Sequence, residues 1–230
     1  MAAREWLQSG TKVVLLGVGS FNPPTIMHLR MFELARNHLE KVFGCTVVEG
    51  IISPVADNYA KKNLASAIHR VEMARLAAST SDWIHADSWE SSQKTWTRTL
   101  QVLKYHQDVA RERHGAATRL MLVSGGDLVD SFPKILENGE NLWHPNDISA
   151  IINDYGLIIV TRGISNPRET LGNLAFLKDT AERAQIISDE VCPCDVSSTR
   201  VRSAIQDGRS IKYAVLDPII AYIQQHGLYR

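Results

Sequence analysis

Short apolar runs alternate with stretches of helical periodicity along the chain, and this alternation limits the fold more than any other feature of the sequence. Residues 12–19 form an apolar run that ends in Gly-Val-Gly, which is typical of a buried strand. Residues 28–39 then place Leu29, Phe32 and Ala35 on one helical face. The same alternation predicts strands over 46–55, 83–87, 119–123, 156–160 and 185–187, and helices over 66–78, 94–113, 147–153, 198–206, 218–226 and from 128 onward.

This order of elements predicts an α/β fold of the Rossmann-like, doubly wound kind, with a mostly parallel sheet and helices on both faces. The predicted linkers are short, so we expect residues 1–230 to form a single domain whose C-terminal helical part begins at about residue 195. In such folds ligands bind at the carboxyl ends of the strands. Four polar loops follow predicted strands, over 19–28, 53–62, 124–127 and 161–163, and we expect them to meet at one edge of the sheet.

The first of these loops reads Gly-Ser-Phe-Asn-Pro-Pro-Thr-Ile-Met-His over residues 19–28. It is neither of the common phosphate-binding loops, because Asn22 stands where the dinucleotide fingerprint needs a glycine and the Gly-Lys-Ser/Thr of a P-loop is absent. Backbone N–H groups at the start of the following helix can still face an anion, and His28 can donate a hydrogen bond to a phosphate oxygen. The alternative is a tight strand-to-helix turn with an incidental histidine.

A second polar segment, Ser-Ser-Thr-Arg-Val-Arg over residues 197–202, opens a predicted helix. Serine and threonine at a helix start are good N-caps. The N–H groups of the first turn, together with Arg200 and Arg202, would make a phosphate clamp. The alternative is a capped amphipathic helix without a ligand.

Taken together, these segments resemble a known family. The loop over 19–28 resembles the signature of nucleotidyltransferases with a His/Thr-x-Gly-His motif. Met27 replaces the usual glycine, as in the Thr-x-Met-His of the eukaryotic nicotinamide mononucleotide adenylyltransferases. Further segments of the sequence resemble that family in the same order, over 50–55, 89–91, 125–127, 142–143 and 197–202, so the resemblance covers nearly the whole chain.

The resemblance implies a reaction and its participants. ATP would transfer its adenylyl group to nicotinamide mononucleotide, and also to nicotinic acid mononucleotide, giving NAD or deamido-NAD and pyrophosphate. The mononucleotide phosphate would attack the ATP α-phosphate directly and in line, so catalysis would rest on positioning and charge neutralisation. The implied catalytic residues are His28 and Arg202, and the implied ATP and phosphate ligands are Gly19, Ser20, Thr25, His28, Thr199, Arg200 and Arg202.

The resemblance also implies a set of residues for the mononucleotide and NAD. Lys61 would bind the mononucleotide phosphate, Trp89 and Trp143 would enclose the nicotinamide ring, and Asp127 would lie near the adenosine-side ribose. The remaining members of this set are Ser92, Gly125, Leu142 and Arg162. Without the resemblance, a lysine pair is usually solvated surface, a tryptophan is usually packing, and an aspartate after two glycines is a turn residue.

Composition narrows the classes of partner. The 25 basic and 25 acidic residues balance, which gives no electrostatic reason to expect a nucleic-acid or membrane-surface partner. No apolar run approaches the roughly 20 residues of a membrane span, and residues 1–10 do not read as a secretory signal. The 3 cysteines indicate free thiols in a reducing compartment. We therefore expect an intracellular protein, with the cytoplasm favoured and the mitochondrion and nucleus left open.

The metal, the preferred mononucleotide, the oligomeric state and an alternative function complete the expectations from the sequence. The 8 histidines show no metal-binding spacing, so we expect no protein metal cage and a Mg²⁺ ion carried by the ATP phosphates. The preference between the two mononucleotides is undetermined, and the oligomeric state is left open with a homo-oligomer favoured. The alternative of another class is a chaperone or nucleotide-sensing protein that binds nucleotides on the same fold without needing turnover.

Overall fold

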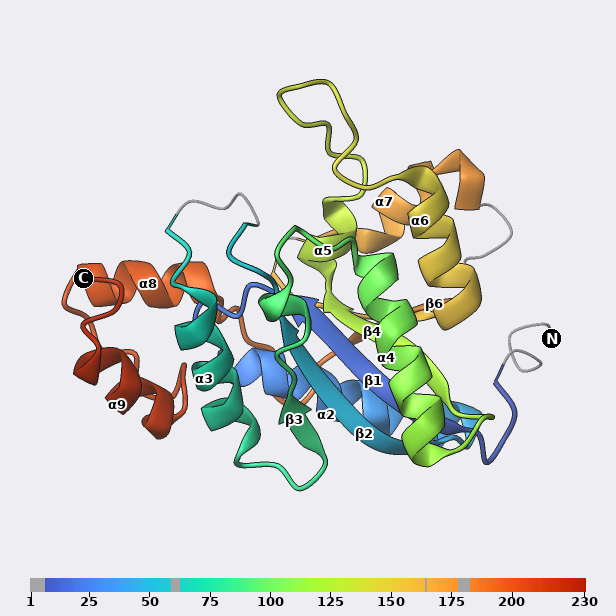
Figure 1. The fold of residues 1–230 in the computed structure, drawn as a ribbon, viewed down its shortest axis with the longest axis horizontal. Helices are drawn as coiled ribbons and strands as arrows, with labels where there is room; N and C mark the ends of the chain where they lie inside the picture. The colour runs from blue at the N-terminus through green and yellow to red at the C-terminus, as the bar shows by residue number, and fades with distance from the viewer. Residues whose placement is uncertain (1–6, 59–62, 164, 178–182) are drawn as a thin grey trace. The chain divides into compact units, whose positions relative to one another are not determined.

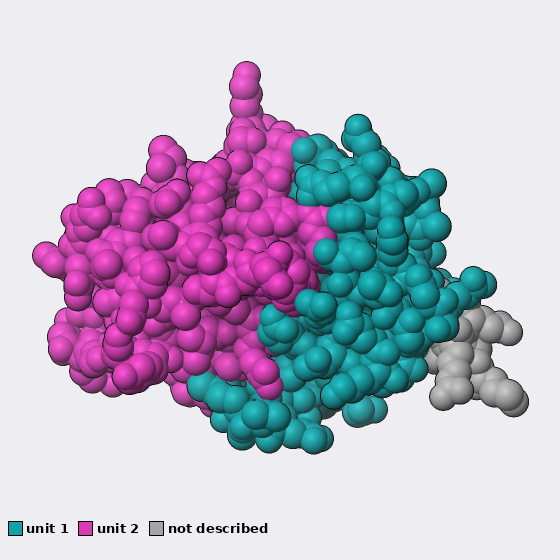
Figure 2. Space-filling model, turned by 90° about the horizontal axis from the view of Figure 1, so that it is seen from below, with its two compact units in different colours: residues 1–16, 31–48, 99–194 teal, residues 17–30, 49–98, 195–230 magenta. Residues whose placement is uncertain are grey.

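The computed structural model describes residues 7–58, 63–163, 165–177 and 183–230. The chain divides into two compact units, which Figure 2 shows in different colours. Unit 1 comprises residues 1–16, 31–48 and 99–194, and unit 2 comprises residues 17–30, 49–98 and 195–230. Each unit is thus built from three separate stretches of sequence. That residues 1–230 act as one domain stays a prediction.

Within the described residues, six strands form one sheet in the order β3-β2-β1-β4-β5-β6. The strands are β1 Lys12–Gly19, β2 Thr46–Pro54, β3 Ile84–Ala86, β4 Arg119–Gly125, β5 Leu157–Thr161 and β6 Ala184–Ser188. β1 pairs in parallel with β4, β4 with β5, β5 with β6, and β2 with β3. After β1, the chain adds β2 and then β3 along one edge of the sheet, and it afterwards adds β4, β5 and β6 along the other edge. This order confirms the predicted doubly wound, parallel α/β fold.

The α-helices follow the predicted order, with shifted ends and with one helix, α7, that was not predicted (Figure 1). The α-helices are α2 Ile26–His38, α3 Ala67–Ala78, α4 Thr99–His114, α5 Gly126–Asp130, α6 Pro145–Ala150, α7 Pro167–Asn173, α8 Ser198–Gln206 and α9 Asp217–Gln225. Single turns of other helix types add η1 Leu39–Phe43, η2 Glu90–Ser92, η3 Ile151–Tyr155 and η4 Ala175–Leu177. Figure 1 shows α4 in front of β1 and β4 and α2 behind them, so helices cover both faces.

Three of the differences from the prediction have local reasons. α4 begins at Thr99 and not at residue 94, because the threonines before it favour local side-chain bonds over a helix, as in the Thr97 hydroxyl that donates to the Thr95 carbonyl. α5 begins two residues earlier than predicted, since Gly125 serves as its N-cap. α7 was not predicted, although Asn166 caps it and Pro167 fills its first turn, which is a helix-start signal in the sequence.

The core of unit 2 holds α8 in place. One cluster of buried apolar side chains joins α3, α8 and α9, and it includes Met73, Ala77, Val201, Ile219 and Ile223. Because Val201 fixes one face of α8 in this core, the opposite face carries the polar residues of the 197–202 segment outward.

In the part of the chain that the structure describes, no helix is long and apolar enough to cross a membrane.

Candidate active site

The loop between β1 and α2, in unit 2, is fixed at both of its ends. At the β1 end, the Val55 amide donates to the Gly19 carbonyl at 2.9 Å and Arg70 Nη1 donates to the Ser20 carbonyl at 3.2 Å. At the α2 end, the Ile26 amide donates to the Ala214 carbonyl at 3.2 Å. The polypeptide between these anchors contains a left-handed residue at Phe21 (φ 44°) and a cis peptide bond before Pro23. Hydrogen bonds thus hold both ends of this loop.

The tautomer of His28 follows from its hydrogen bonds. The Thr25 amide donates to His28 Nδ1 at 3.0 Å, and the Thr25 hydroxyl lies 2.7 Å from the same nitrogen. A backbone amide can only donate, so Nδ1 must carry a lone pair, and in the neutral ring the proton then resides on Nε2. The His28 side chain thus caps the Thr25 amide at the start of α2, as the glutamate of a capping box does, while the His28 amide donates to the Thr25 carbonyl at 3.0 Å. The cap at the start of α2 thus makes Nε2 a hydrogen-bond donor.

The start of α8 is hydrogen-bonded to this same loop. Ser197 caps α8, since its hydroxyl accepts from the Arg200 amide at 3.3 Å. Next to it, the Ser198 hydroxyl donates to the Pro23 carbonyl at 2.8 Å, and Arg202 Nη1 donates to the Asn22 carbonyl at 2.8 Å. The structure therefore brings together the two segments that the sequence singled out, 19–28 and 197–202, although 175 and 180 residues separate the bonded pairs.

The two arginines of α8 differ in their surroundings. Arg200 Nη2 lies 3.6 Å from Asp195 Oδ2, and its side chain is 69% exposed. The bonds that Arg202 makes to described residues go to neutral oxygens, which are the Asn22 carbonyl at 2.8 Å and the Thr199 hydroxyl at 3.5 Å. Within the described residues, no carboxylate lies at ion-pair distance from Arg202. Its positive charge is thus uncompensated and available to an anionic ligand.

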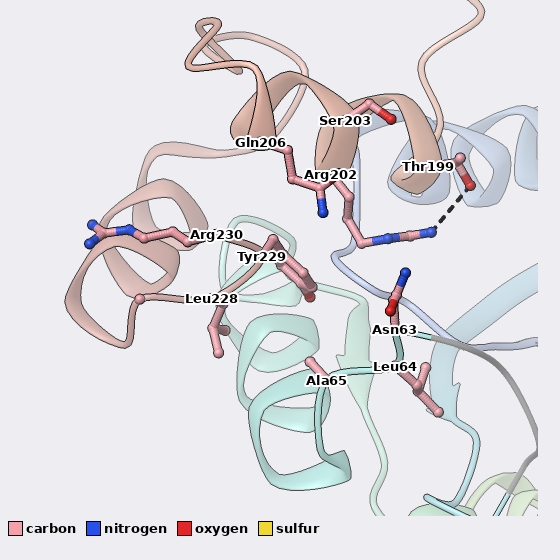
Figure 3. A pocket seen from close by; sticks show the side chains of 11 residues that line it. Asn63, Leu64, Ala65, Thr199, Arg202, Ser203, Gln206, Leu228, Tyr229 and Arg230 are labelled. Atoms are coloured by element: carbon pink, nitrogen blue, oxygen red, sulfur yellow. Dashed lines mark hydrogen bonds between the residues drawn. The ribbon is translucent and has the colours of Figure 1, made fainter.

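A pocket of about 460 Å³ opens beside Arg202 in unit 2 (Figure 3). It is lined by α8, by residues 63–65 and by residues 227–230, and none of its 11 lining residues is acidic. Figure 3 shows the Arg202 side chain running past Tyr229 toward the Thr199 hydroxyl, with Asn63 beneath it. The pocket therefore suits a negatively charged group.

Two buried polar residues near this loop were missed by the sequence prediction. Arg70 has no exposed side-chain surface, and it donates to the Ala65 carbonyl at 2.7 Å and the Ser20 carbonyl at 3.2 Å and pairs with Asp57 at 3.0 Å. A signal was present, because Arg70 occupies a position of the apolar stripe of α3, three residues after Ala67.

Asn22 is the second of these residues, and it is fully buried. Its side-chain amide donates to the Asn63 carbonyl at 2.9 Å and accepts from the Ala65 amide at 3.1 Å and from the Tyr229 hydroxyl at 2.8 Å. Its backbone carbonyl is the acceptor for Arg202. The sequence offered no signal for this role, since each of these partners is distant along the chain.

The segment around Trp89 places the ring half-buried on the turn η2. Its neighbour Glu90 is buried, and the Ser53 hydroxyl donates to Glu90 Oε2 at 2.5 Å. Burial raises the pKa of Glu90 to about 7, against the opposing effects of the Ser53 hydrogen bond and the charge of Arg70. The predicted ligand Ser92 is exposed, and its hydroxyl donates locally to the Trp89 carbonyl at 2.8 Å.

In unit 1, three predicted residues lie together where β4 and β5 end. Arg162 Nη2 lies 3.6 Å from Asp127 Oδ2, and the Asp127 side chain is 72% exposed. A Cβ atom on Gly125 would lie 2.5 Å from Asp127 Oδ1. The carboxylate can occupy its observed position because residue 125 has no side chain. The polar loops that follow strands therefore meet in pairs within each unit, after β1 and β2 in unit 2 and after β4 and β5 in unit 1.

The remaining predicted residues of unit 1 are Leu142 and Trp143. Trp143 is half-buried, its Nε1 donates to the Ser131 hydroxyl at 3.0 Å, and its ring meets Phe132 edge-on at 5.2 Å. The Leu142 amide donates to the Lys134 carbonyl at 2.9 Å. These contacts fix the tryptophan ring from one side. Lys61 lies outside the described residues.

Metal-binding and redox groups are sparse. Among the described residues, no group of three or more His, Cys, Asp or Glu side chains is placed to hold a metal ion. The cysteines Cys45, Cys192 and Cys194 are all free thiols, as predicted.

Comparisons with known sequences agree on one family. The family model described as cytidylyltransferase-like matches residues 16–204. A nicotinamide/nicotinic acid mononucleotide adenylyltransferase 2 from Caenorhabditis elegans is 49% identical over 220 residues, which cover 95% of this chain and 98% of that protein. A nicotinamide/nicotinic acid mononucleotide adenylyltransferase 1 from Bos taurus is 36% identical over 256 residues, covering 95% of this chain and 89% of that protein.

Solved structures support the fold. Plasmodium falciparum nicotinic acid mononucleotide adenylyltransferase complexed with APC superposes with a TM-score of 0.65 at 18% identity, covering 95% of this chain and 97% of that one. The same enzyme complexed with NaAD gives a TM-score of 0.64. At 18% identity, the structural similarity shows a shared fold alone.

Proposed function

Because the chain belongs to the cytidylyltransferase-like family and, within it, to the nicotinamide/nicotinic acid mononucleotide adenylyltransferases, we propose that it joins ATP to nicotinamide mononucleotide. The products are NAD and pyrophosphate. Nicotinic acid mononucleotide is a second substrate and gives deamido-NAD. The enzyme is thus a nucleotidyltransferase of NAD synthesis.

The observation that carries this proposal is the fixed tautomer of His28. Its Nε2–H group is a donor because Nδ1 accepts from the Thr25 amide at 3.0 Å. A neutral donor at the start of α2 can hydrogen-bond an oxygen of the ATP α-phosphate, and it stabilises the negative charge that develops there during transfer. Gly19 and Ser20 form the turn that lets the backbone approach the same phosphate.

The chemical step is a single displacement. An oxygen of the mononucleotide 5′-phosphate forms a bond to the ATP α-phosphorus while the bond from that phosphorus to the bridging oxygen of the β-phosphate breaks. The attacking phosphate is already an anion at neutral pH, so no general base is required. Pyrophosphate leaves with the bond electrons, and Thr199, Arg200 and Arg202 stabilise its charge. ATP enters as its Mg²⁺ complex, with the ion bound to the phosphates.

We assign the mononucleotide and adenosine contacts to residues outside the loop between β1 and α2. The exposed carboxylate of Asp127, held beside Arg162, suits hydrogen bonds to ribose hydroxyls. The half-buried rings of Trp89 and Trp143 suit stacking with a cationic pyridinium ring. For Lys61, the assignment to the mononucleotide phosphate rests on the sequence. The compartment and the homo-oligomeric state stay predictions.

The first test is NAD and pyrophosphate formation from ATP, Mg²⁺ and nicotinamide mononucleotide, with nicotinic acid mononucleotide run in parallel. Turnover of about 1 s⁻¹ or faster with either mononucleotide would support the proposal. Folded protein that forms no product from either one would refute it.

A pair of substitutions at His28 separates its two nitrogens. In His28→Asn the amide oxygen can replace Nδ1 as the acceptor for Thr25, but no donor reaches the place of Nε2. In His28→Gln a donor reaches that place while the cap is lost. We expect Asn to retain stability and to lose about 100-fold or more in turnover, and Gln to recover part of the turnover at lower stability. Calorimetric titration with nicotinamide mononucleotide should show little change in either variant, and an equal loss of binding and turnover would mean that His28 only binds.

A further inference from the structure

The position of Arg202 depends on a residue that is far from it in the sequence. Arg202 Nη1 donates to the backbone carbonyl of Asn22 at 2.8 Å, so the orientation of its guanidinium group follows the orientation of that peptide unit. Asn22 has no exposed surface, and each polar group of its side chain is bonded. Whatever fixes the Asn22 side chain therefore also fixes the acceptor of Arg202.

The Tyr229 hydroxyl is one of the groups that fix Asn22. It donates to Asn22 Oδ1 at 2.8 Å across 207 residues of sequence. Tyr229 also lines the pocket beside Arg202, and Figure 3 shows its ring directed toward Arg202 and Asn63. Burial raises the pKa of Tyr229 well above its usual value, although the charges of Arg202 and Arg70 act in the opposite direction. The hydroxyl is therefore protonated, and able to donate, at neutral pH.

We propose that Tyr229 is a positioning residue of the adenylyl-transfer site, which acts through Asn22 to aim Arg202 at the triphosphate of ATP and at the leaving pyrophosphate. This inference rests on the proposed function. Arg202 is suited to the task because its bonds to the described residues go to neutral oxygens, so these contacts orient its charge without neutralising it. Arg200, by contrast, faces Asp195 at 3.6 Å.

The test compares Tyr229→Phe with a matched control on the preceding helix. Tyr222→Phe also removes one tyrosine hydroxyl bond, to His69 Nδ1 at 3.0 Å, and it does so away from Asn22. Both variants should show a similar loss of thermal stability. We expect Tyr229→Phe alone to raise the KM for ATP and to weaken the binding of inorganic pyrophosphate, each about fivefold, while the KM for nicotinamide mononucleotide changes less than twofold.

A double-mutant cycle tests the route through Arg202. If Tyr229 acts by aiming Arg202, Tyr229→Phe should have no further effect on pyrophosphate binding in an Arg202→Ala background. Additive effects of the two substitutions, or equal behaviour of Tyr229→Phe and Tyr222→Phe, would overturn the inference.

Pyrophosphate binding, measured by calorimetry on the whole protein, keeps this inference distinct from the proposed function. Wild-type protein that binds pyrophosphate through Arg202 and Tyr229 but forms no NAD would refute the function and leave the positioning role supported. If the wild type forms NAD and the Tyr229→Phe variant binds pyrophosphate as tightly as the wild type does, the positioning role alone is refuted. Wild-type protein that does not bind pyrophosphate at all would also refute it.

Discussion

At the scale of single residues, the site depends on polar groups that are buried and still satisfied. Arg70 is the clearest case, because a guanidinium group without exposed surface is tolerated only when hydrogen bonds replace water. Its partners are two backbone carbonyls and the half-exposed carboxylate of Asp57. Arg70 thereby ties the Ser20 end of the loop between β1 and α2 to α3.

Substitution of Arg70 should measure the strength of this tie. Arg70→Met would leave the carbonyls of Ser20 and Ala65 without their donor, and we expect the free energy of unfolding to fall by about 3 kcal/mol. The control is Arg75→Met on the same helix, where the ion pair with Glu72 is exposed and 3.6 Å long, so its loss should cost less than about 0.5 kcal/mol. Urea denaturation of both variants checks this, and equal stabilities would mean that the buried contacts of Arg70 carry no net energy.

The raised pKa of Glu90 predicts that the free energy of unfolding depends on pH. Its pKa is raised from 4.5 to about 7 in the folded protein, so the folded state holds the proton more tightly than the unfolded state. This group therefore contributes stability below about pH 4.5, and the contribution is lost as the pH rises through about 7. The loss is on the order of 3 kcal/mol, since each pKa unit corresponds to about 1.4 kcal/mol.

The substitution Glu90→Gln removes the titrating group and keeps an acceptor for Ser53. We expect the stability of the variant relative to wild type to improve by about 2 to 3 kcal/mol between pH 5 and pH 8, as measured by chemical denaturation. Ser53→Ala should shift the same transition to higher pH, because the Ser53 hydrogen bond lowers the pKa of Glu90. Parallel pH curves for wild type and Glu90→Gln would contradict the account.

At the scale of elements, glycines at the end of β4 allow α5 to pack closely. A Cβ atom on Gly126 would overlap the Ser165 hydroxyl and lie 2.8 Å from Ser165 Cβ, in the segment that leads into α7. Ser165 Cβ is attached directly to the backbone and cannot rotate away, so the backbone would have to move. The start of α5 and the residues before α7 can therefore meet only if position 126 lacks a side chain.

This packing gives a prediction with an internal control. Gly126→Ala should lower the free energy of unfolding by about 1 to 3 kcal/mol through overpacking. Gly172→Ala lies within α7, where a Cβ atom would meet nothing within 4 Å, and it should be neutral or stabilising by up to about 1 kcal/mol. Thermal unfolding of the two variants distinguishes them, and a neutral Gly126→Ala would show that α5 packs less tightly than its contacts imply.

At the scale of the whole molecule, the order of elements was largely predictable. The strands were predicted within two residues at either end, because a buried parallel strand needs an apolar run and a Gly- or Pro-containing turn, and both are local in sequence. α7 was missed because its seven residues carry no clear apolar stripe, even though its cap is readable. The resemblance to a known family added roles for residues, such as Asp127 and Trp143, that periodicity could not supply.

The sequence by itself determined the alternation of strands and helices, the polar loops that follow the strands, and the cap at Ser197, since all of these arise between neighbours along the chain. Only the tertiary structure decided which buried groups hold the loop between β1 and α2. Asn22 meets Arg202 and Tyr229 across 180 and 207 residues. Burial and hydrogen bonding of a polar group depend on whatever the fold packs around it, and no local pattern encodes partners at such separations.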